Sequence, residues 1–253
     1  MSNPGVKPLA DARPMDNGRI MAVQPWLSIV MPVLNEGDGL DAALQALQPW
    51  RQSGAEVIVV DGGSTDQSLA LAARGADQAV SAPRGRALQM NAGAALARAD
   101  WLLFLHADTR LPEQGIERLR SLIQTDAVWG RFDVRIDSGH ALLRLVGFMM
   151  NLRSRISAIA TGDQALFVRR QVFERVGAFP NIALMEDIAL SRRLKSLARP
   201  ACLRPPVLTS ARRWQRHGIG STIWLMWRLR AAYFFGADPD QLAVRYGYPP
   251  RKN

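Results

Sequence analysis

The stretch that decides the fold of this 253-residue chain is Val57-Ile58-Val59-Val60-Asp61-Gly62-Gly63-Ser64-Thr65-Asp66. Its apolar, β-branched run predicts a buried strand that delivers the carboxylate of Asp61 to the C-terminal edge of a sheet. Parallel α/β sheets bind their ligands at that edge. The glycines, hydroxyl residues and second acid that follow are typical of a turn that opens a helix. The stretch therefore predicts an α/β fold with a ligand site beside Asp61.

Two other units repeat this design. Leu27–Val33 leads into Asn35 and Glu36, and Trp101–Leu105 leads into His106-Ala107-Asp108. Helical patterns separate the strands, which favours right-handed crossovers and a mostly parallel central sheet flanked by helices. Three strands that end in groups able to bind a metal or a ribose point to a nucleotide-dependent enzyme.

The rest of the chain is expected to continue this alternation and then to change character. Further elements of the first half are helices from about residue 38 until Pro49, at Ser68–Arg74 and from residue 86 through Ala99, and a strand at Gln78–Ser81. The second half is expected to hold strands at Ala127–Ile136 and Ala165–Val168 and helices at Gln171–Arg175 and Asp187–Leu197. Leu142–Ala160 is apolar but carries three arginines, which favours an amphipathic helix over a membrane-spanning one.

The composition is that of a folded globular protein with an excess of positive charge. The net charge is +10, which favours anionic partners such as nucleotide-sugar phosphates, anionic lipid or nucleic acid. The arginines are spread along the chain, which counts against a nucleic-acid-binding module, so we expect no nucleic-acid partner. Cys202 is the only cysteine and cannot form an intrachain disulfide. A lone thiol fits the reducing cytoplasm.

Each polar strand end has two interpretations. An Asx turn explains Asp61-Gly62-Gly63 as well as a carboxylate that grips a nucleotide base or ribose. Asn35 and Glu36 pose the same choice between a turn and a nucleotide-contacting edge. His106 and Asp108 either form a turn or hold Mg²⁺ or Mn²⁺ against a diphosphate.

The second half offers an acid pair and a basic motif. Glu186 and Asp187 open a predicted helix, where carboxylates often act only as caps but are also well held for general-base catalysis. Gly162-Asp163-Gln164 precedes a strand and is equally consistent with a turn. Arg212-Arg213-Trp214 either clasps a diphosphate or is a solvated loop around a core tryptophan. The aromatic segment from Ile219 to Phe235 either packs in the core or contacts a membrane interface.

Taken in order, these motifs resemble a family-2 glycosyltransferase with the GT-A fold, from about Leu27 to Gly218. The resemblance rests on six segments, which are residues 28–36, 59–66, 84–93, 105–108, 162–164 and 186–187. Each segment is weak alone, and the order and spacing of all six carry the identification. Leu105–Thr109 and Ser210–Trp214 look most like a small bacterial branch, the radical-SAM/selenodomain-associated type.

The resemblance implies a division of the chain. Residues 1–25 are expected to be a flexible leader, because they lack the apolar region of a signal peptide. Residues 26–218 would form the GT-A catalytic domain, with a nucleotide-binding half at 26–110 and an acceptor half at 111–218. Residues 219–253 would form an amphipathic, aromatic tail. The expected location is the cytoplasm, with peripheral contact at the inner face of the membrane as an option.

The resemblance also implies roles for single positions. The expected nucleotide edge consists of Pro32, Asn35, Glu36 and Asp61. Arg86 would contact the base or the phosphates. Asp108 matches the last acid of the family's Asp-x-Asp motif, which implies Mn²⁺ or Mg²⁺ as cofactor. His106 replaces the first acid of that motif, and this leaves the identity and the necessity of the metal open.

On the acceptor side, Asp187 of the Glu186-Asp187 motif matches the base that activates the acceptor. The acceptor-side loop is matched by Gly162, Asp163 and Gln164. Arg213 and Trp214 resemble the basic-aromatic motif that stabilises the leaving diphosphate, and Trp214 is also expected to contact the acceptor.

The expected reaction is an inverting, metal-assisted transfer from a nucleotide-diphospho-sugar to an acceptor hydroxyl. A sugar-phosphate nucleotidyltransferase is the alternative enzyme, but it needs a basic, glycine-rich loop where this chain has Pro32–Glu36. The amphipathic segments leave open a lipid or other apolar acceptor, a peripheral membrane contact and a homodimer interface.

Overall fold

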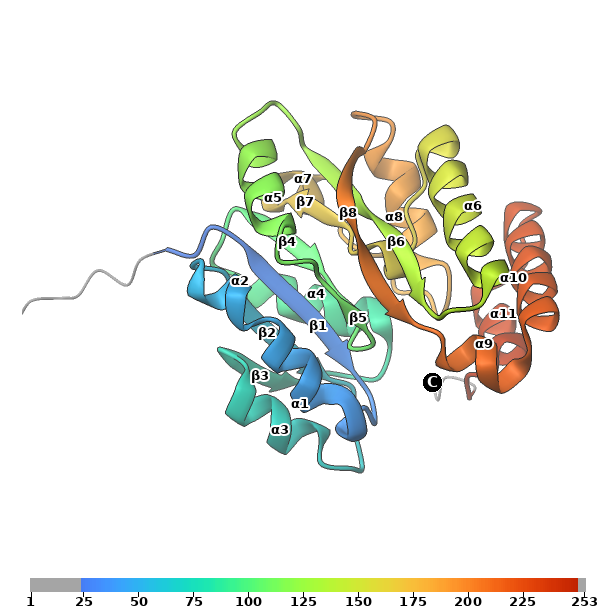
Figure 1. The fold of residues 1–253 in the computed structure, drawn as a ribbon, viewed down its shortest axis with the longest axis horizontal. Helices are drawn as coiled ribbons and strands as arrows, with labels where there is room; N and C mark the ends of the chain where they lie inside the picture. The colour runs from blue at the N-terminus through green and yellow to red at the C-terminus, as the bar shows by residue number, and fades with distance from the viewer. Residues whose placement is uncertain (1–23, 250–253) are drawn as a thin grey trace, which may run out of the picture.

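The computed structural model describes residues 24–249, which form one curled sheet with helices on both faces (Figure 1). The strands are β1 Ser28–Val33, β2 Glu56–Asp61, β3 Gln78–Ser81, β4 Trp101–Phe104, β5 Thr109–Arg110, β6 Trp129–Asp137, β7 Phe167–Arg169 and β8 Ala201–Ser210. The helices are α1 Gly37–Ala46, α2 Gln48–Gln52, α3 Ser68–Gly75, α4 Arg86–Leu96, α5 Gly115–Ile123, α6 Ala141–Ser157, the 3₁₀ turn η1 Gly162–Gln164, α7 Arg170–Arg175, α8 Glu186–Leu194, α9 Arg212–His217, α10 Ile219–Phe234 and α11 Pro239–Tyr246. The prediction of a flexible leader falls almost wholly outside the described residues.

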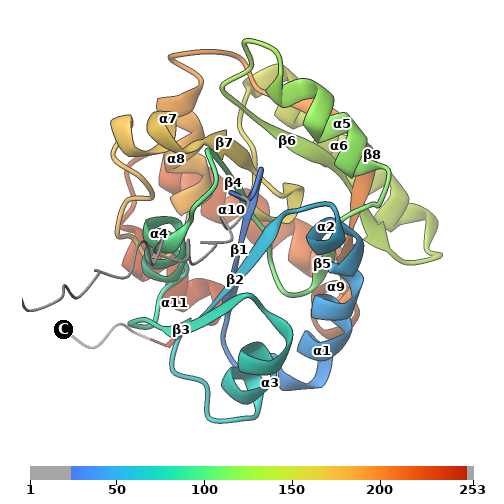
Figure 2. The same ribbon diagram turned by 90° about the vertical axis from the view of Figure 1, so that its left-hand side faces the viewer.

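The first half of the sheet is parallel, in the order β3-β2-β1-β4. β1 and β2 are buried along their whole lengths, since α1 and α2 lie on one side of them and α4 on the other (Figure 2). A strand covered on both faces needs apolar side chains throughout, which explains its continuous hydrophobic run. The strands predicted at Glu56–Asp61 and Gln78–Ser81 are confirmed residue for residue.

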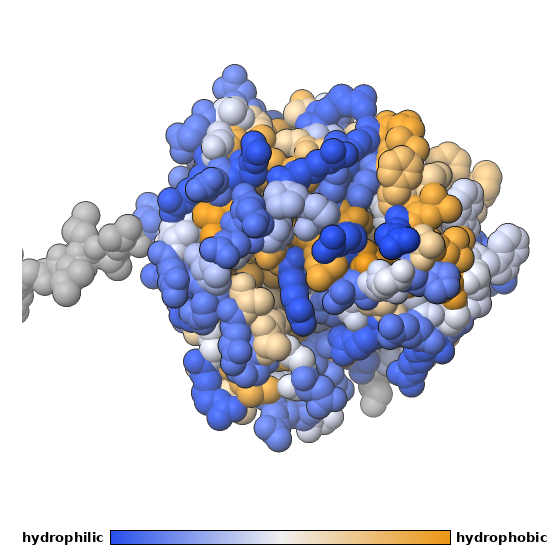
Figure 3. All heavy atoms as spheres, in the orientation of Figure 1, coloured by the Kyte–Doolittle hydropathy of each residue, from blue (hydrophilic) through white to orange (hydrophobic). Residues whose placement is uncertain are grey.

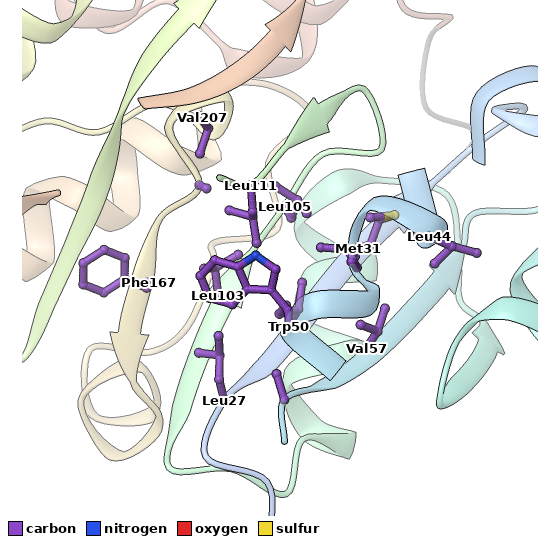
Figure 4. Close-up of a cluster of buried hydrophobic side chains, with 14 of the residues drawn as sticks. Leu27, Met31, Leu44, Trp50, Val57, Leu103, Leu105, Leu111, Phe167 and Val207 are labelled. Atoms are coloured by element: carbon purple, nitrogen blue, oxygen red, sulfur yellow. The ribbon is translucent and has the colours of Figure 1, made fainter. Parts of the chain in front are cut away.

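Alternate side chains of these strands enter two different cores. Met31 of β1 and Val57 of β2 join Trp50 of α2 in one buried cluster (Figure 4). Ile58 lies on the opposite face, in a second cluster that includes Met90 of α4. Each fully buried large apolar side chain contributes roughly 2 kcal/mol relative to an exposed one. This packing fixes β1, β2 and β4 side by side, so that their C-terminal ends meet at one edge.

Beyond β4 the sheet is mixed. β7 lies antiparallel to both β4 and β6, β6 and β8 run parallel, and β5 is antiparallel to β8. The predicted α/β class is therefore confirmed, with a sheet that is parallel throughout its first half and mixed in its second. The sequence pattern does not predict β8, because Pro205 and Pro206 interrupt it. These prolines lie where the β6–β8 register shifts between Phe132 and Val134, a position at which a strand tolerates proline.

Several helix boundaries differ from expectation; α6, for example, spans Ala141–Ser157 rather than Leu142–Ala160, and α8 ends at Leu194 rather than Leu197. The first helix ends at Ala46, and Pro49 lies in the first turn of α2, where its missing N–H costs no hydrogen bond. Helix α4 ends at Leu96 rather than Ala99, and α8 already begins at Glu186.

The segment from Ile219 onward folds back onto the second half of the domain. Helices α10 and α11 pack through Leu229 and Leu242 against Leu184 and Met185, which precede α8. Helix α6 lies next to α10 (Figure 1). None of the helices among the described residues is both long enough and apolar enough to cross a membrane.

Candidate active site

The acid pair opens α8 and is held tightly by the backbone. The two Asp187 carboxylate oxygens accept hydrogen bonds from the Gly162 N–H at 2.8 Å and from the Ile188 N–H at 2.7 Å. Glu186 is only 4% exposed. Met185, directly before them, has a φ of +70°, a left-handed conformation that is costly for a bulky residue. Such local strain is typical of functional sites.

Burial perturbs the titration of both acids. It raises the pKa of Glu186 to about 7, and the negative charge of Asp187 adds to the effect. Burial also raises the pKa of Asp187, against the two backbone hydrogen bonds, which favour the charged form. Two adjacent carboxyl groups with raised pKa values can hold a proton near neutral pH, as acid–base catalysis requires.

His106 belongs to the same cluster. Its Nδ1 lies 3.5 Å from the Asp163 carboxylate, in the turn that also contains Gly162. A Cβ added at Gly162 would lie 2.4 Å from the imidazole, so only glycine allows this approach. Burial opposes ionisation of Asp163, but His106 and the nearby arginines hold its pKa below the usual value. The segment after β4 therefore meets the acceptor-side loop and the acid pair.

Two arginines face these acids. Arg86, the first residue of α4, is half-buried. Burial opposes its charge, but Tyr248 and Glu186 hold its pKa above the usual value. Arg153 of α6 has its pKa lowered by burial, although Asp187 and Asp163 favour its charged form. One guanidinium nitrogen of Arg153 is buried without a hydrogen-bond partner.

The C-terminal segment covers the arginines on the other side. The guanidinium carbon of Arg213 lies 3.6 Å from the centre of the Tyr246 ring, and its Nη2 donates to the Tyr246 carbonyl at 3.0 Å. The guanidinium carbon of Arg86 lies 5.6 Å from the centre of the Tyr248 ring. These cation–π contacts hold both guanidinium groups in place.

Asp61 forms a turn at the end of β2, and one of its carboxylate oxygens takes no part in that turn. One carboxylate oxygen accepts from the N–H groups of Gly63 and Ser64, both at 2.9 Å, and thus forms the turn. The other oxygen is buried and has no partner in the described structure. A buried acceptor without a donor is costly, so this oxygen is suited to a ligand N–H or O–H.

The neighbouring strand end is organised by Asn35 and Glu36. Asn35 has a φ of +54°, and its side-chain oxygen accepts from the Thr65 N–H at 2.9 Å. Glu36 accepts from the Arg212 guanidinium at 3.1 Å, which ties α9 to the end of β1. Pro32 lies inside β1, past the point where the β1–β4 ladder ends at Val30, so its missing N–H removes no ladder bond.

One cavity of about 1040 Å³ gathers most of the predicted site residues. Its lining includes Arg86, His106, Asp108, Gly162, Asp163, Glu186, Asp187, Arg213 and Trp214. Pro32, Asn35, Glu36 and Asp61 lie outside this lining and connect to it through the Glu36–Arg212 ion pair. Gln164 is fully buried. Its amide oxygen accepts from the Thr161 N–H at 3.2 Å, and its amide nitrogen donates to the side-chain oxygen of Asn151 at 3.3 Å. Gln164 thus holds the acceptor-side loop from behind.

Asp108, the acid predicted to bind the metal, has an exposed side chain. It is exposed at the cavity and accepts from the Thr109 hydroxyl at 3.3 Å. Within residues 24–249, no three His, Cys, Asp or Glu side chains gather as a metal cluster. Mg²⁺ and Mn²⁺ at phosphate sites need only one or two protein carboxylates, because the substrate supplies other oxygens. The donor set therefore fits a cation shared between Asp108 and a diphosphate.

Three residues in the site were not predicted. Tyr246 and Tyr248 lie 160 and more residues from Arg86, and no local pattern marks their contact. Arg153 does carry a signal, since it interrupts the apolar face of α6 with a charge. Helical spacing places that charge on the cavity side, together with Met149 and Ile156.

Comparison with known proteins identifies the family. The sequence profile described as glycosyl transferase family 2 matches residues 28–177, more than half of the chain. Glycosyltransferase AglE of Haloferax volcanii is 30% identical in an alignment of 179 positions that covers 62% of this chain and 57% of that protein. The chain thus spans less than two thirds of the length of this relative.

Two solved structures share the fold. S. aureus TarS in complex with UDP-GlcNAc has a TM-score of 0.61 and 18% identity, over 73% of this chain and 58% of that one. The mannosyltransferase PcManGT from Pyrobaculum calidifontis, in complex with GDP-Man and Mn²⁺, has a TM-score of 0.60 and 18% identity, over 89% and 70%. The chain belongs to glycosyl transferase family 2, and its curled mixed sheet is a GT-A fold.

Proposed function

We propose that this protein transfers a sugar from a nucleotide-diphospho-sugar to an acceptor hydroxyl by a single inverting displacement. One observation carries the proposal: Asp187 lies half-buried in the cavity that also contains Arg86, Arg213 and Asp108. This reaction needs a base, positively charged side chains that bind the diphosphate, and a metal ligand. Asp187, the two arginines and Asp108 would supply these groups in one cavity. The Leu105–Thr109 and Ser210–Trp214 motifs support the small bacterial, radical-SAM/selenodomain-associated branch as the subfamily.

Asp187 acts as the general base. It is more open to the cavity than Glu186, and its two backbone hydrogen bonds orient the carboxylate and favour its charged form. A neutral Glu186 beside it avoids the repulsion between two carboxylates. Asp187 removes the proton of the acceptor hydroxyl while that oxygen attacks the anomeric carbon. The bond to the diphosphate breaks on the opposite face, which inverts the configuration.

The donor binds across the ends of β1 and β2. The free buried oxygen of Asp61 accepts a hydrogen bond from the nucleotide, and Asn35 and Glu36 keep the adjoining turns in place. From there the diphosphate reaches Arg86 and Arg213, whose positions Tyr246 and Tyr248 fix. Arginines offer paired N–H groups that match phosphate oxygens and stabilise the leaving group.

The metal and the acceptor loop complete the site. Asp108 would hold Mn²⁺ or Mg²⁺ together with the diphosphate, and a bound cation neutralises part of the leaving-group charge. His106, Asp163 and Gln164 are positioning residues for the Gly162 turn that orients Asp187. Trp214 lines the cavity beside Arg213 and is proposed to contact the acceptor.

The experiment that tests this function is incubation with a panel of UDP, GDP and dTDP sugars in the presence of Mn²⁺ or Mg²⁺. Release of the nucleoside diphosphate, with water as the substitute acceptor, is the expected result for at least one donor. A parallel assay with sugar 1-phosphates and nucleoside triphosphates checks the nucleotidyltransferase alternative. Pyrophosphate release in that assay, without hydrolysis of any nucleotide sugar, would overturn the proposal.

A further inference from the structure

Helix α6 has a second apolar face that the sheet does not cover. Leu143 and Gly147 are buried on the side toward β6. Leu145, Met149 and Ile156 line the cavity, where they remain 53%, 50% and 72% exposed. These residues recur at spacings of four and seven, so they lie on one side of the helix, with Arg153 between Met149 and Ile156.

Helix α10 presents a matching face. Ile223, Met226 and Trp227 line the same cavity at helical spacing, and Trp227 is 72% exposed. Figure 3 shows apolar residues gathered on the part of the surface formed by α6 and α10, with hydrophilic residues among them. Contiguous apolar surface of this kind marks a binding site in a folded protein.

The apolar lining and the acid pair belong to one continuous cavity. Along α6 the lining runs from Leu142 to Ser157, about 22 Å of helix at 1.5 Å per residue. The same cavity therefore joins Asp187 and several arginines to a long row of apolar side chains. A ligand that contacts both is an amphiphile.

The charges on the two helices have the same sign. Neither α6 nor α10 contains an aspartate or a glutamate, whereas α6 carries Arg144, Arg153 and Arg155 and α10 carries Arg228 and Arg230. Arg153 and Arg230 line the cavity. An apolar chain with a neutral or anionic polar head matches this lining, because its chain meets mostly apolar side chains and its head meets arginine, with no carboxylate from either helix.

We infer that the α6–α10 groove, formed by Leu145, Met149, Leu152, Ile156, Met226 and Trp227, holds the apolar chain of the acceptor. The acceptor is then a lipid-like alcohol whose hydroxyl lies at Asp187 while its chain extends between the two helices. This inference rests on the proposed function, which supplies the reason for a hydroxyl at Asp187.

The test uses the full chain and a pyrene-labelled long-chain alcohol kept below its micelle concentration, with fluorescence anisotropy as the readout. Saturable binding to the native protein is expected. The double variant Leu145→Glu/Met149→Glu places two charges in the groove, and its affinity should fall about tenfold or more. The matched control is Leu69→Glu/Leu96→Glu, because these two leucines are 41% and 39% exposed and lie outside the cavity lining.

Calorimetric binding of UDP and GDP with Mn²⁺ is measured on the same proteins and should not change in the groove variant. No binding of the alcohol to the native protein, or equal binding in both double variants, would overturn the inference. Binding only to phospholipid vesicles, or a dimer that the groove variant dissociates, would also overturn it, in favour of a membrane or a second copy. Alcohol binding without any nucleotide binding would refute the proposed function and leave the groove as an apolar site.

Discussion

The Gly162 N–H donates a hydrogen bond to the Asp187 carboxylate at 2.8 Å, while the α-carbon of Gly162 lies against the His106 ring. Three segments far apart in the sequence meet at this point: the end of β4, the turn η1 and the start of α8. A side chain at position 162 would push them apart. The absence of a side chain at position 162 therefore allows the Gly162 N–H to orient Asp187, the proposed base.

Gly162→Ala should lower the rate of nucleoside diphosphate release by about tenfold or more, because small displacements of a catalytic group are costly. Stability should fall by about 1–3 kcal/mol, since the new Cβ would lie 2.4 Å from the imidazole. Gly139→Ala is the matched control, because a Cβ there meets nothing within 4 Å. Initial rates and thermal melts check this prediction, and equal rates for the two variants would contradict it.

The acid pair predicts how stability depends on pH. Glu186 has a pKa near 4.5 when unfolded and about 7 in the folded protein, so between these values the folded state holds the extra proton. The contribution of Glu186 to the free energy of unfolding is fully present below pH 4.5 and is lost as the pH rises toward 7. Over this range the free energy of unfolding should fall by up to about 1.4 kcal/mol per pH unit. Denaturant unfolding at several pH values should show a shallower decline in Glu186→Gln. An unchanged slope in that variant would mean that Glu186 titrates normally.

Removal of the proposed metal ligand should affect the metal dependence of donor binding. Asp108→Asn leaves an amide in place of an exposed carboxylate, so the fold should persist while the gain in nucleotide affinity upon adding Mn²⁺ disappears. Calorimetry with and without Mn²⁺ measures this gain. Asp126→Asn, at an exposed acid outside the cavity, is the control. If Asp108→Asn keeps the full gain, another group binds the cation.

Arg213 tests the leaving-group contact. Arg213→Lys keeps the charge but loses the planar group that stacks on Tyr246, and turnover should fall about tenfold or more. Arg216→Lys, on the exposed side of the same helix, should behave like the native protein. The comparison uses initial rates at saturating donor. Parallel losses in both variants would point to the charge of α9 as a whole.

Local patterns in the sequence predict the first half of the fold well. Glu56–Asp61 and Gln78–Ser81 are strands with their expected ends. For Glu56–Asp61 the reason is burial along the whole strand, which requires the apolar run Val57–Val60. The mixed second half is harder, since the pairing of β8 with β6 depends on contacts between distant segments. Pro205 and Pro206 also make the sequence of β8 typical of a loop rather than a strand.

The candidate site also contains some residues that local motifs predict and some contacts that they do not. Short motifs locate Asp61, Asp108 and Asp187, because each follows a strand or opens a helix. The contacts of Arg86 and Arg213 with the C-terminal tyrosines have no local signature, so only the folded structure shows them.

The most direct test of the central claim is a comparison of the native protein with Asp187→Asn, using the donor that the panel identifies. The variant keeps the shape of the side chain but cannot accept a proton. Both Asp187 oxygens accept backbone N–H groups, so the amide loses one of these bonds and the melting temperature should fall modestly. Nucleoside diphosphate release should fall by a factor on the order of 10²–10⁴, with the donor dissociation constant nearly unchanged. Undiminished release, or loss of donor binding together with loss of the fold, would show that Asp187 serves only as a helix cap.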